Sequence, residues 1–260
     1  MCKVKVSILT IVRNPEVLWF HECLSSVANQ LHSNIEHVIV DGSDEAYSSE
    51  VFEIVSQYPN SVYNRQLSNG LWPAFEEGLA LCTGDVIGVI NSDDYLADPH
   101  VLEEICTYFP DYDYIYGNSE RVDVNGDRLY VQKPLKWLNS YLFDHLVFNI
   151  SHHTLYFKRE ILKDIPFLDD SYGVEAYDLI FCRKLFRSSL AGQNIKRTIA
   201  CFRLHESNHS RSYSSSDTQL LYRAFTGSKH GYFLWRCFQY MVNPKYFYYL
   251  LRRTISEMFK

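Results

Sequence analysis

Apolar and polar positions follow two different periods along the first 91 residues of the chain. Some segments are rich in β-branched residues and apolar at consecutive positions, as expected of strands in a sheet that is covered on both faces. The predicted strands are residues 4–12, 35–42 and 85–91, with a shorter one at 61–67. The predicted helices, which carry apolar residues at helical spacing, are residues 15–31, 48–58 and 73–82. This alternation predicts an α/β, Rossmann-like fold with a mainly parallel sheet and helices on both faces.

Each predicted strand ends in or runs into a polar cluster. In chain order the clusters are "TIVRN", "DGSDE", "SNG" and "NSDD". Open α/β sheets bind ligands in the crevice at the carboxyl ends of their strands. We therefore expect a ligand site along this edge of the sheet, which we call the carboxyl edge.

The last of these clusters places two carboxylates side by side, Asp93 and Asp94. Adjacent carboxylates at a strand end repel one another and lose solvation unless a positive charge lies beside them. A divalent cation such as Mg²⁺ or Mn²⁺ would supply that charge, since both ions take carboxylate oxygens. The alternative is purely structural: Asp93 caps the segment that follows, and Asp94 belongs to a solvated turn.

Composition narrows the class of protein. The chain has 260 residues, 47% of them hydrophobic, and can bury a sizeable core. Its net charge of −6 gives no general field for nucleic acid, so we expect no nucleic-acid partner. The seven cysteines contain no CxxC pair, which indicates neither a disulfide framework nor a zinc site and favours a reducing, cytoplasmic location. No run reaches the 18 or so apolar residues of a transmembrane helix.

Several segments together carry a family resemblance. They are "VSILTIVRN", "IEHVIVDGSD", "NGLWPAFEEGLALCTGDVIGVINSDDYLADP", "ISHHTLYFKREIL", "YDLIFCRKL" and "IACFRLH". In this order and spacing the chain resembles family 2 glycosyltransferases of the GT-A fold, and more narrowly bacterial enzymes that build O-antigen or colanic-acid repeat units. The resemblance covers roughly residues 3–207, so we expect a catalytic domain over residues 1–208.

The resemblance implies transfer of a sugar from a UDP-sugar to a hydroxyl, with inversion at the anomeric carbon. "NSDD" matches the family's DXD-type motif, with Asn91 in the place of a first Asp. By position in that motif, Asp94 is the first choice for the ligand of Mn²⁺ or Mg²⁺, and Asp93 binds the ribose or shares the metal. A cation that bridges the diphosphate would stabilise the leaving group.

Further positions match the family's contacts to the donor nucleotide. They are Thr10, Arg13, Asp41, Gly70 and Ser92. An aspartate carboxylate accepts the N3–H of uracil, which suits Asp41, but a turn or helix cap is its structural alternative. The alternative for Arg13 is a plain surface residue.

Two departures from the family pattern concern the reaction itself. The loop 68–78 reads "SNGLWPAFEEG", without the acidic and basic residues that related enzymes carry there, although Gly70 still allows a close backbone approach. Related enzymes place the catalytic base before a Tyr-Asp-Leu run, and here that position is Ala176. Glu175 and Asp178 are the candidate bases, with Glu175 preferred because it is adjacent and one methylene longer. An acid such as Asp178 in a first helical turn is also favoured by the helix dipole alone.

Three histidines are candidates for the acceptor and phosphate side. His152 and His153 precede a predicted strand where the resembling family lines its acceptor site, and His205 follows in "FRLH". The alternatives for the histidine pair are hydrogen bonding in the core and metal ligation.

The remainder, residues 209–260, begins with a Ser-rich stretch and ends in a segment with many basic and aromatic residues, 228–260. A basic, aromatic helical segment in an acidic protein indicates attachment to an anionic membrane surface, which would suit a lipid-diphosphate-linked acceptor and a peripheral location on the inner face of the cytoplasmic membrane. Its alternative is packing on the catalytic domain or on a second copy in a homo-oligomer. Two other functions stay open: a catalytically silent nucleotide-sugar-binding subunit, which Ala176 favours, and a metal-dependent nucleotidyltransferase.

Overall fold

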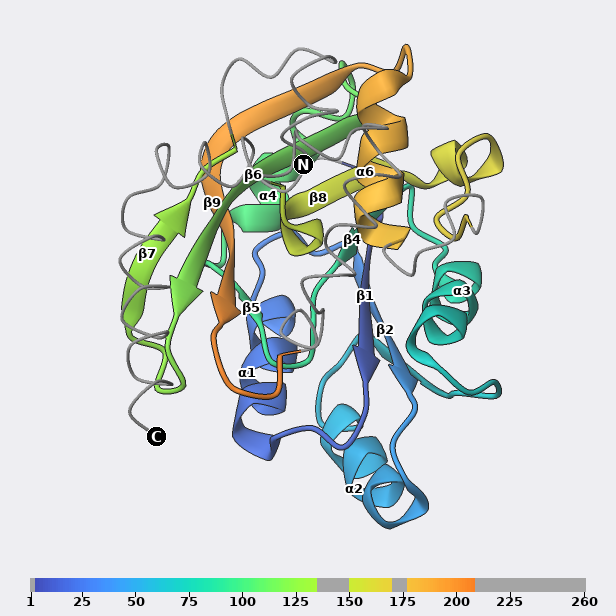
Figure 1. Cartoon of the computed structure of the whole chain (residues 1–260), viewed down its shortest axis with the longest axis vertical. Helices are drawn as coiled ribbons and strands as arrows, with labels where there is room; N and C mark the ends of the chain where they lie inside the picture. The colour runs from blue at the N-terminus through green and yellow to red at the C-terminus, as the bar shows by residue number, and fades with distance from the viewer. Residues whose placement is uncertain (1–2, 135–149, 170–176, 209–260) are drawn as a thin grey trace, which may run out of the picture.

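The computed structural model describes residues 3–134, 150–169 and 177–208 (Figure 1). The strands in this part of the chain are β1 (Val6–Val12), β2 (Ile35–Asp41), β3 (Ser61–Arg65), β4 (Val86–Val89), β5 (Tyr95–Leu96), β6 (Tyr114–Val122), β7 (Arg128–Gln132), β8 (Leu155–Lys158) and β9 (Gly192–Arg203). They form one sheet in the order β3-β2-β1-β4-β8-β6-β9-β5, and β7 pairs with β6.

Helices cover both faces of this sheet, as the alternation predicted. They are α1 (Val17–Ala28), α2 (Glu45–Val55), α3 (Leu71–Leu81), α4 (Val101–Cys106) and α6 (Tyr177–Arg187), with 3₁₀ turns η1 (His152–Thr154) and η2 (Arg159–Lys163). Leu9 of β1 packs in one core with α3 and α6, whereas its neighbour Ile8 packs in another with α1 and α4. This alternation of side chains along β1 is the two-residue period of a strand that is buried on both faces.

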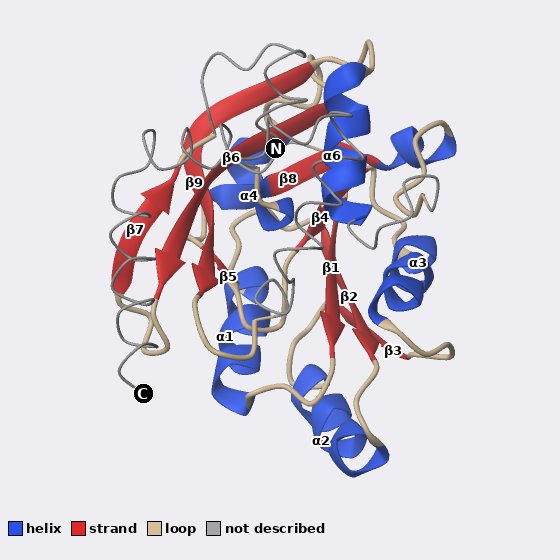
Figure 2. Cartoon of the chain, in the orientation of Figure 1, coloured by secondary structure: helices blue, strands red, loops and turns tan. Residues whose placement is uncertain are grey.

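The sheet is parallel in its first half and mixed in its second. Strands β1, β2, β3 and β4 pair in parallel, and Figure 2 shows β1 and β2 running side by side in the same direction. Strand β8 pairs antiparallel with both β4 and β6, and β6 then pairs in parallel with β9. The alternation of strands and helices along the sequence predicts only the parallel strand pairs, because parallel strands need a crossover connection, usually a helix, whereas antiparallel neighbours do not. The mainly parallel sheet predicted from the first 91 residues is therefore the β3-β2-β1-β4 half.

The polar clusters after β1, β2 and β4 meet at the carboxyl edge. The Thr10 hydroxyl donates to the carbonyl of Ile90 (2.9 Å), which joins the end of β1 to the segment after β4. The amide of Asn14 donates to Ser43 Oγ (2.9 Å), which joins the loop after β1 to the loop after β2. The predicted meeting of these clusters is thus present in the fold.

The opposite edge of the sheet is held by a carboxylate network. Glu36 accepts hydrogen bonds from Lys5 Nζ (2.5 Å), from the Ser7 hydroxyl and from the backbone N–H of Thr83 (2.6 Å). Burial alone would raise the pKa of Glu36, but these hydrogen bonds outweigh it and lower the pKa to about 2. The network ties β1, β2 and the start of β4 together at this end.

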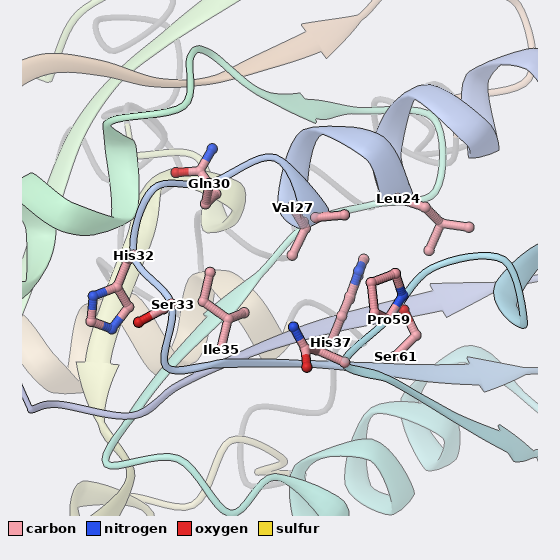
Figure 3. Close-up of a pocket in the computed structure, with 11 residues that line it drawn as sticks. Leu24, Val27, Gln30, His32, Ser33, Ile35, His37, Pro59 and Ser61 are labelled. Carbon is pink, nitrogen blue, oxygen red and sulfur yellow. The ribbon is translucent and has the colours of Figure 1, made fainter.

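A cavity of about 180 Å³ also lies at this opposite edge (Figure 3). It is formed where α1 ends and where β2 and β3 begin, and Ile35, His37 and Ser61 are among its lining residues. Gln30, one of its polar lining residues, donates to the carbonyls of Ser26 (3.0 Å) and Asp98 (2.8 Å). This cavity therefore lies away from the carboxyl edge and does not form part of the candidate active site.

The buried imidazole of His37 makes folding sensitive to acid. Burial lowers the pKa of His37 to about 3, whereas an unfolded chain protonates histidine near 6.5. Between these values the unfolded chain binds more protons, so the free energy of unfolding rises with pH, by up to about 1.4 kcal/mol per pH unit for one such group. We predict that the free energy of unfolding, measured by urea titration at several pH values between 4 and 7, rises less steeply with pH in His37→Gln than in the wild type. His100→Gln, at an exposed position, is the matched control and keeps the slope. Equal slopes in all three proteins would contradict this role of His37.

Candidate active site

Asp94 lies at the end of β4 with its carboxylate turned into the protein. The side chain is fully buried. Its Oδ1 accepts from the backbone N–H of Arg203 (2.9 Å) and its Oδ2 accepts from Asn91 Nδ2 (2.7 Å). Burial, and then the charge of Asp93, raise the pKa of Asp94 well above its usual range. Asp94 therefore connects β9 to the loop after β4, which leaves it poorly placed for the metal-ligand role that its motif position implies.

Asp93 faces the other way and reaches solvent at the carboxyl edge. Its side chain is 25% exposed, and its Oδ2 lies 2.6 Å from Nε2 of His205, which is 11% exposed. Asn208 Nδ2 lies 3.4 Å from the same oxygen and 2.9 Å from His205 Nε2. The structure thus brings together two residues singled out from the sequence, 112 positions apart, as a carboxylate and an imidazole that converge on one point.

Sequence reasoning missed several residues of this site, among them Trp19, Asn208 and, most centrally, Arg203. Its side chain is almost fully buried, although guanidinium groups rarely are. Its Nε donates to the carbonyl of Asp93 (3.2 Å), and its Nη1 donates to the carbonyls of Asp123 and Val124 (3.2 Å each). Its Nη2 pairs with the Glu22 carboxylate. One arginine therefore joins the loop after β4, the turn between β6 and β7, and α1; the only signal for it was its place two residues before His205.

Trp19 of α1 packs against the same group of side chains. Its ring lies 4.8 Å from the imidazole of His205, centroid to centroid, and 5.2 Å from the guanidinium carbon of Arg203. Tyr95 lies on Arg203 at 5.6 Å. Aromatic faces attract a guanidinium at these distances, so the rings add to the support of the Asp93–His205 pair.

The two candidate groups on the acceptor side, His152 and Asp178, lie next to each other. His152 Nδ1 is 3.2 Å from Asp178 Oδ2, and each side chain is 25% exposed. On its other side, His152 Nε2 is 3.1 Å from Asn91 Oδ1. Asp178 thus has a histidine partner at the carboxyl edge. The other candidate base, Glu175, and Ala176 lie outside the described residues.

His153, in contrast, belongs to the core. It is 1% exposed, and its Nε2 lies 2.7 Å from Ser119 Oγ and 3.4 Å from Arg121 Nη1. Burial lowers the pKa of His153 well below its usual range. The geometry is that of the hydrogen-bonded core residue named as the alternative from the sequence, because a fully enclosed ring cannot contact an acceptor or a phosphate.

In β1 and at the end of β2, where contacts to the donor nucleotide were expected, Thr10 and Asp41 are fully buried. The Thr10 hydroxyl lies 2.9 Å from His37 Nε2 in addition to its bond to Ile90. The Asp41 carboxylate accepts from the Ser43 amide (2.8 Å), and also from the hydroxyls of Ser48 (2.7 Å) and Tyr63 (2.8 Å). These contacts of Asp41 match its structural alternative, a residue that holds a turn together. The side chains of Thr10 and Asp41 therefore bond within the protein and are not presented to a nucleotide.

The outward-facing side chains at this end belong to the loops themselves. Arg13 is 72% exposed, 3.8 Å from the Asp44 carboxylate. Asn14 has a positive φ of 45° and exchanges two hydrogen bonds with Asp44, one from Nδ2 (2.8 Å) and one to Oδ1 (2.9 Å). An asparagine tolerates this left-handed backbone well. Arg13, Asn14 and Asp44 are exposed polar residues of these two loops.

The segment 68–78, which leads into α3, packs against the start of α6. Gly70 has φ +110°, which side-chain-bearing residues rarely adopt, and its carbonyl accepts from Gln66 Nε2 (2.8 Å). Trp72 packs edge-on against Tyr177 at the start of α6 (4.8 Å between centroids). Ser92 is half-buried between Asn91 and Asp93. The loop that departs from the family pattern is therefore in contact with the helix that carries Asp178.

Within the described ranges, no group of three or more histidine, cysteine, aspartate or glutamate side chains is arranged to hold a metal ion. A cation at Asp93 and His205 would need its further ligands from a substrate or from water. Among the helices described, none is long and apolar enough to cross a membrane.

The buried contacts of Arg203 make a direct prediction for stability. Arg203→Ala removes a guanidinium from carbonyl and carboxylate partners and is expected to lower the free energy of unfolding on the order of 3 kcal/mol. Arg13→Ala is the matched control, because Arg13 and Asp44 are 72% and 61% exposed in their ion pair, and an exposed pair contributes little to stability. Urea unfolding of the three proteins measures the difference. Equal losses in both variants would show that Arg203 does not hold the site.

Curated relatives of the chain are named as sugar-transferring or polysaccharide-building proteins. O-antigen biosynthesis protein RfbC of Myxococcus xanthus is 25% identical over 184 residues, which is 67% of this chain and 14% of that protein. The PGL/p-HBAD biosynthesis glycosyltransferase of Mycobacterium bovis is 26% identical over 150 residues, which is 55% of each chain. The chain thus spans about half of the mycobacterial relative and a small part of the larger protein.

Solved structures share the fold at low identity. S. aureus TarS 1–349 in complex with UDP-GlcNAc superposes with a TM-score of 0.61 at 18% identity, over 81% of this chain and 61% of that one. The mannosyltransferase PcManGT of Pyrobaculum calidifontis, in complex with GDP-Man and Mn²⁺, gives 0.58 at 15% identity, over 80% and 59%. The expected GT-A fold is confirmed. The family model for glycosyl transferase family 2 matches residues 7–166, more than half of the chain. The chain belongs to glycosyl transferase family 2.

Proposed function

We propose that this glycosyltransferase moves a sugar, with inversion, from a UDP-sugar to a hydroxyl of a bacterial surface polysaccharide repeat unit. The observation that carries the proposal is the Asp93–His205 pair, partly exposed at the carboxyl end of β4 and 2.6 Å apart. A carboxylate and an imidazole at this edge suit a nucleoside diphosphate with its cation. The named relatives, an O-antigen biosynthesis protein and glycosyltransferases, support the polysaccharide context.

The donor is proposed to be a nucleotide sugar that lies along the carboxyl edge. Of the structural neighbours, TarS holds UDP-GlcNAc and PcManGT holds GDP-Man. In this chain the base and ribose would lie by Arg13, Asn14 and Asp44, and the diphosphate by Asp93. We retain UDP as the preferred nucleotide from the family resemblance.

We propose Asp93 and His205 as the protein ligands of Mn²⁺ or Mg²⁺. This replaces the first choice from the motif, Asp94, whose two oxygens are already occupied inside the protein. Two protein ligands fit a cation that takes its remaining ligands from the donor phosphates and water. A mixed oxygen and imidazole set suits Mn²⁺ better than Mg²⁺. When bound, the cation would offset the negative charge that develops on the leaving diphosphate.

The residues of this chain would position the sugar donor and the acceptor hydroxyl for the direct displacement. Asp94 and Arg203 fix the loop that carries Asp93, while Trp19 and Asn208 hold His205. On the acceptor side, the direct displacement needs a carboxylate that takes the proton of the attacking hydroxyl, and the sequence offers Glu175 and Asp178. Positioning of this kind accounts for a large part of the rate gain in reactions of two substrates.

The acceptor is proposed to be linked to a lipid diphosphate and met at the inner face of the cytoplasmic membrane. The support is in the sequence: the basic and aromatic segment 228–260 suits an anionic lipid surface. That segment lies outside the described residues, as does the Ser-rich stretch that precedes it. A homo-oligomer through the same segment is the alternative use of its aromatic residues.

Binding of UDP distinguishes the two aspartates. By calorimetry, we expect the wild type to bind UDP more tightly with Mn²⁺ than with chelator. Asp93→Asn should lose the metal-dependent part of the affinity while the free energy of unfolding stays unchanged, because its side chain is partly exposed. Asp94→Asn should lower the free energy of unfolding instead, because its buried oxygens bond to β9 and Asn91. Metal-independent binding in the wild type, or full metal dependence in Asp93→Asn, would contradict the proposed site.

Fluorescence of Trp19 reports on the same cation without any turnover. Its ring lies 4.8 Å from His205, so paramagnetic Mn²⁺ bound there should quench its emission in the presence of UDP, whereas diamagnetic Mg²⁺ should not. Trp19→Phe is expected to lose this quenching, and Trp72→Phe, the control, to keep it. Quenching that persists in Trp19→Phe would place the metal elsewhere.

A further inference from the structure

A line of contacts runs from the buried end of β4 to the acceptor side of the carboxyl edge. Asn91 donates from Nδ2 to Asp94 Oδ2 (2.7 Å) and presents Oδ1 to His152 Nε2 (3.1 Å). His152 then presents Nδ1 to Asp178 Oδ2 (3.2 Å). Asn91 and Asp94 are half-buried and buried, whereas His152 and Asp178 are each 25% exposed. The line therefore begins in the core and ends at a carboxylate that solvent reaches.

The chemistry of these atoms fixes where the protons lie. The amide of Asn91 gives its NH₂ to Asp94, so the atom that it offers His152 is an oxygen, which only accepts. His152 Nε2 must then carry a proton. Its Nδ1 faces the Asp178 carboxylate at 3.2 Å. Asn91 thus sets the orientation of His152, and His152 in turn orients Asp178.

An asparagine is the residue type that this line requires at position 91. An aspartate there would place a carboxylate oxygen 2.7 Å from the buried Asp94 carboxylate, a repulsion with no cation in between. It would also remove the donor that Asp94 uses. The departure of this chain from the first Asp of the motif thereby supplies the amide that begins the line of contacts to Asp178.

We propose that Asp178, held by His152 and Asn91, is the catalytic base that takes the proton of the acceptor hydroxyl; this rests on the proposed glycosyl transfer. Asp178 is the catalytic residue, and His152 and Asn91 are positioning residues. A carboxylate at the first turn of α6 is favoured by the helix dipole, but the dipole gives no reason for a histidine to face it at 3.2 Å or for an amide to fix that histidine.

The step balances with the groups already named. The O–H bond of the acceptor breaks, and its proton passes to the Asp178 oxygen that does not face His152. The acceptor oxygen forms its bond to the anomeric carbon on one face of the sugar. On the other face the bond from that carbon to the diphosphate oxygen breaks, and the electron pair leaves with the nucleoside diphosphate. The proton on Asp178 afterwards passes to solvent, which the side chain reaches.

The test uses the whole chain with UDP-GlcNAc as donor and water as the acceptor, followed by release of UDP. Asp178→Asn is expected to lower kcat on the order of 10²- to 10⁴-fold, with the Kd for UDP and Mn²⁺ unchanged. His152→Gln is expected to lower kcat on the order of 10²-fold through misplacement of the base, again at constant Kd. The matched controls are Asp113→Asn, whose carboxylate pairs with Lys158 at 28% exposure, and His21→Gln; both keep the wild-type rate.

Chemical rescue separates a base from a merely structural residue. Formate should restore part of the rate of Asp178→Ala, since a small carboxylate can take the same proton, and imidazole should restore part of the rate of His152→Ala. Asp178→Ala also replaces Asp178→Asn in the rate test should the latter unfold.

The outcomes separate this inference from the proposed function. A wild type that neither binds UDP nor releases it from UDP-GlcNAc overturns the proposed function, and the inference with it. A wild type that turns over while Asp178→Asn matches Asp113→Asn overturns the inference alone. Loss of the rate in Glu175→Gln, with Asp178→Asn active, would assign the base to Glu175.

Discussion

The burial of Asp94 and Arg203 beside one another is the constraint on which the candidate active site depends. A carboxylate and a guanidinium that leave water must find partners for nearly all of their polar atoms. Asp94 finds them in Asn91 and in the Arg203 backbone, and Arg203 finds them in the Asp93 carbonyl, Glu22 and the turn after β6. Meeting these demands brings the end of β9, the end of β4 and α1 to one place. The partly exposed Asp93–His205 pair is a result of that arrangement.

The same division between an inward and an outward residue occurs twice along the carboxyl edge. Asp94 is buried and Asp93 is partly exposed; His153 is buried and its neighbour His152 is partly exposed. In each pair the inward side chain bonds to the framework, and the outward one faces the space where the substrates are proposed to lie. Asn91 connects the two pairs, because its amide touches Asp94 on one side and His152 on the other. The proposed donor and acceptor sides are therefore positioned by one set of hydrogen bonds.

The sequence predicted the parallel half of the sheet and the edge at which the polar clusters meet, because strand and helix periods report on local chain geometry. It could not predict the antiparallel pairing of β8, which depends on contacts between segments far apart in the chain. Nor could it tell the inward from the outward member of an adjacent pair: Asp94 was preferred to Asp93 from its motif position, and only tertiary packing shows which carboxylate reaches solvent. Arg203 carries no periodic signal at all, since its importance arises from the three segments that it joins: the loop after β4, the turn between β6 and β7, and α1. The roles of Thr10 and Asp41 depend in the same way on their neighbours, which leave neither side chain exposed.

The account is tested most directly by a crystal structure of the protein with UDP and Mn²⁺. It predicts one metal ion coordinated by Asp93 and His205 and by the diphosphate of UDP, with the uridine toward Arg13 and Asn14 and with Asp94 still bonded to Asn91 and Arg203. A metal ion bound by Asp94 without Asp93, or UDP bound away from the carboxyl edge, would contradict it.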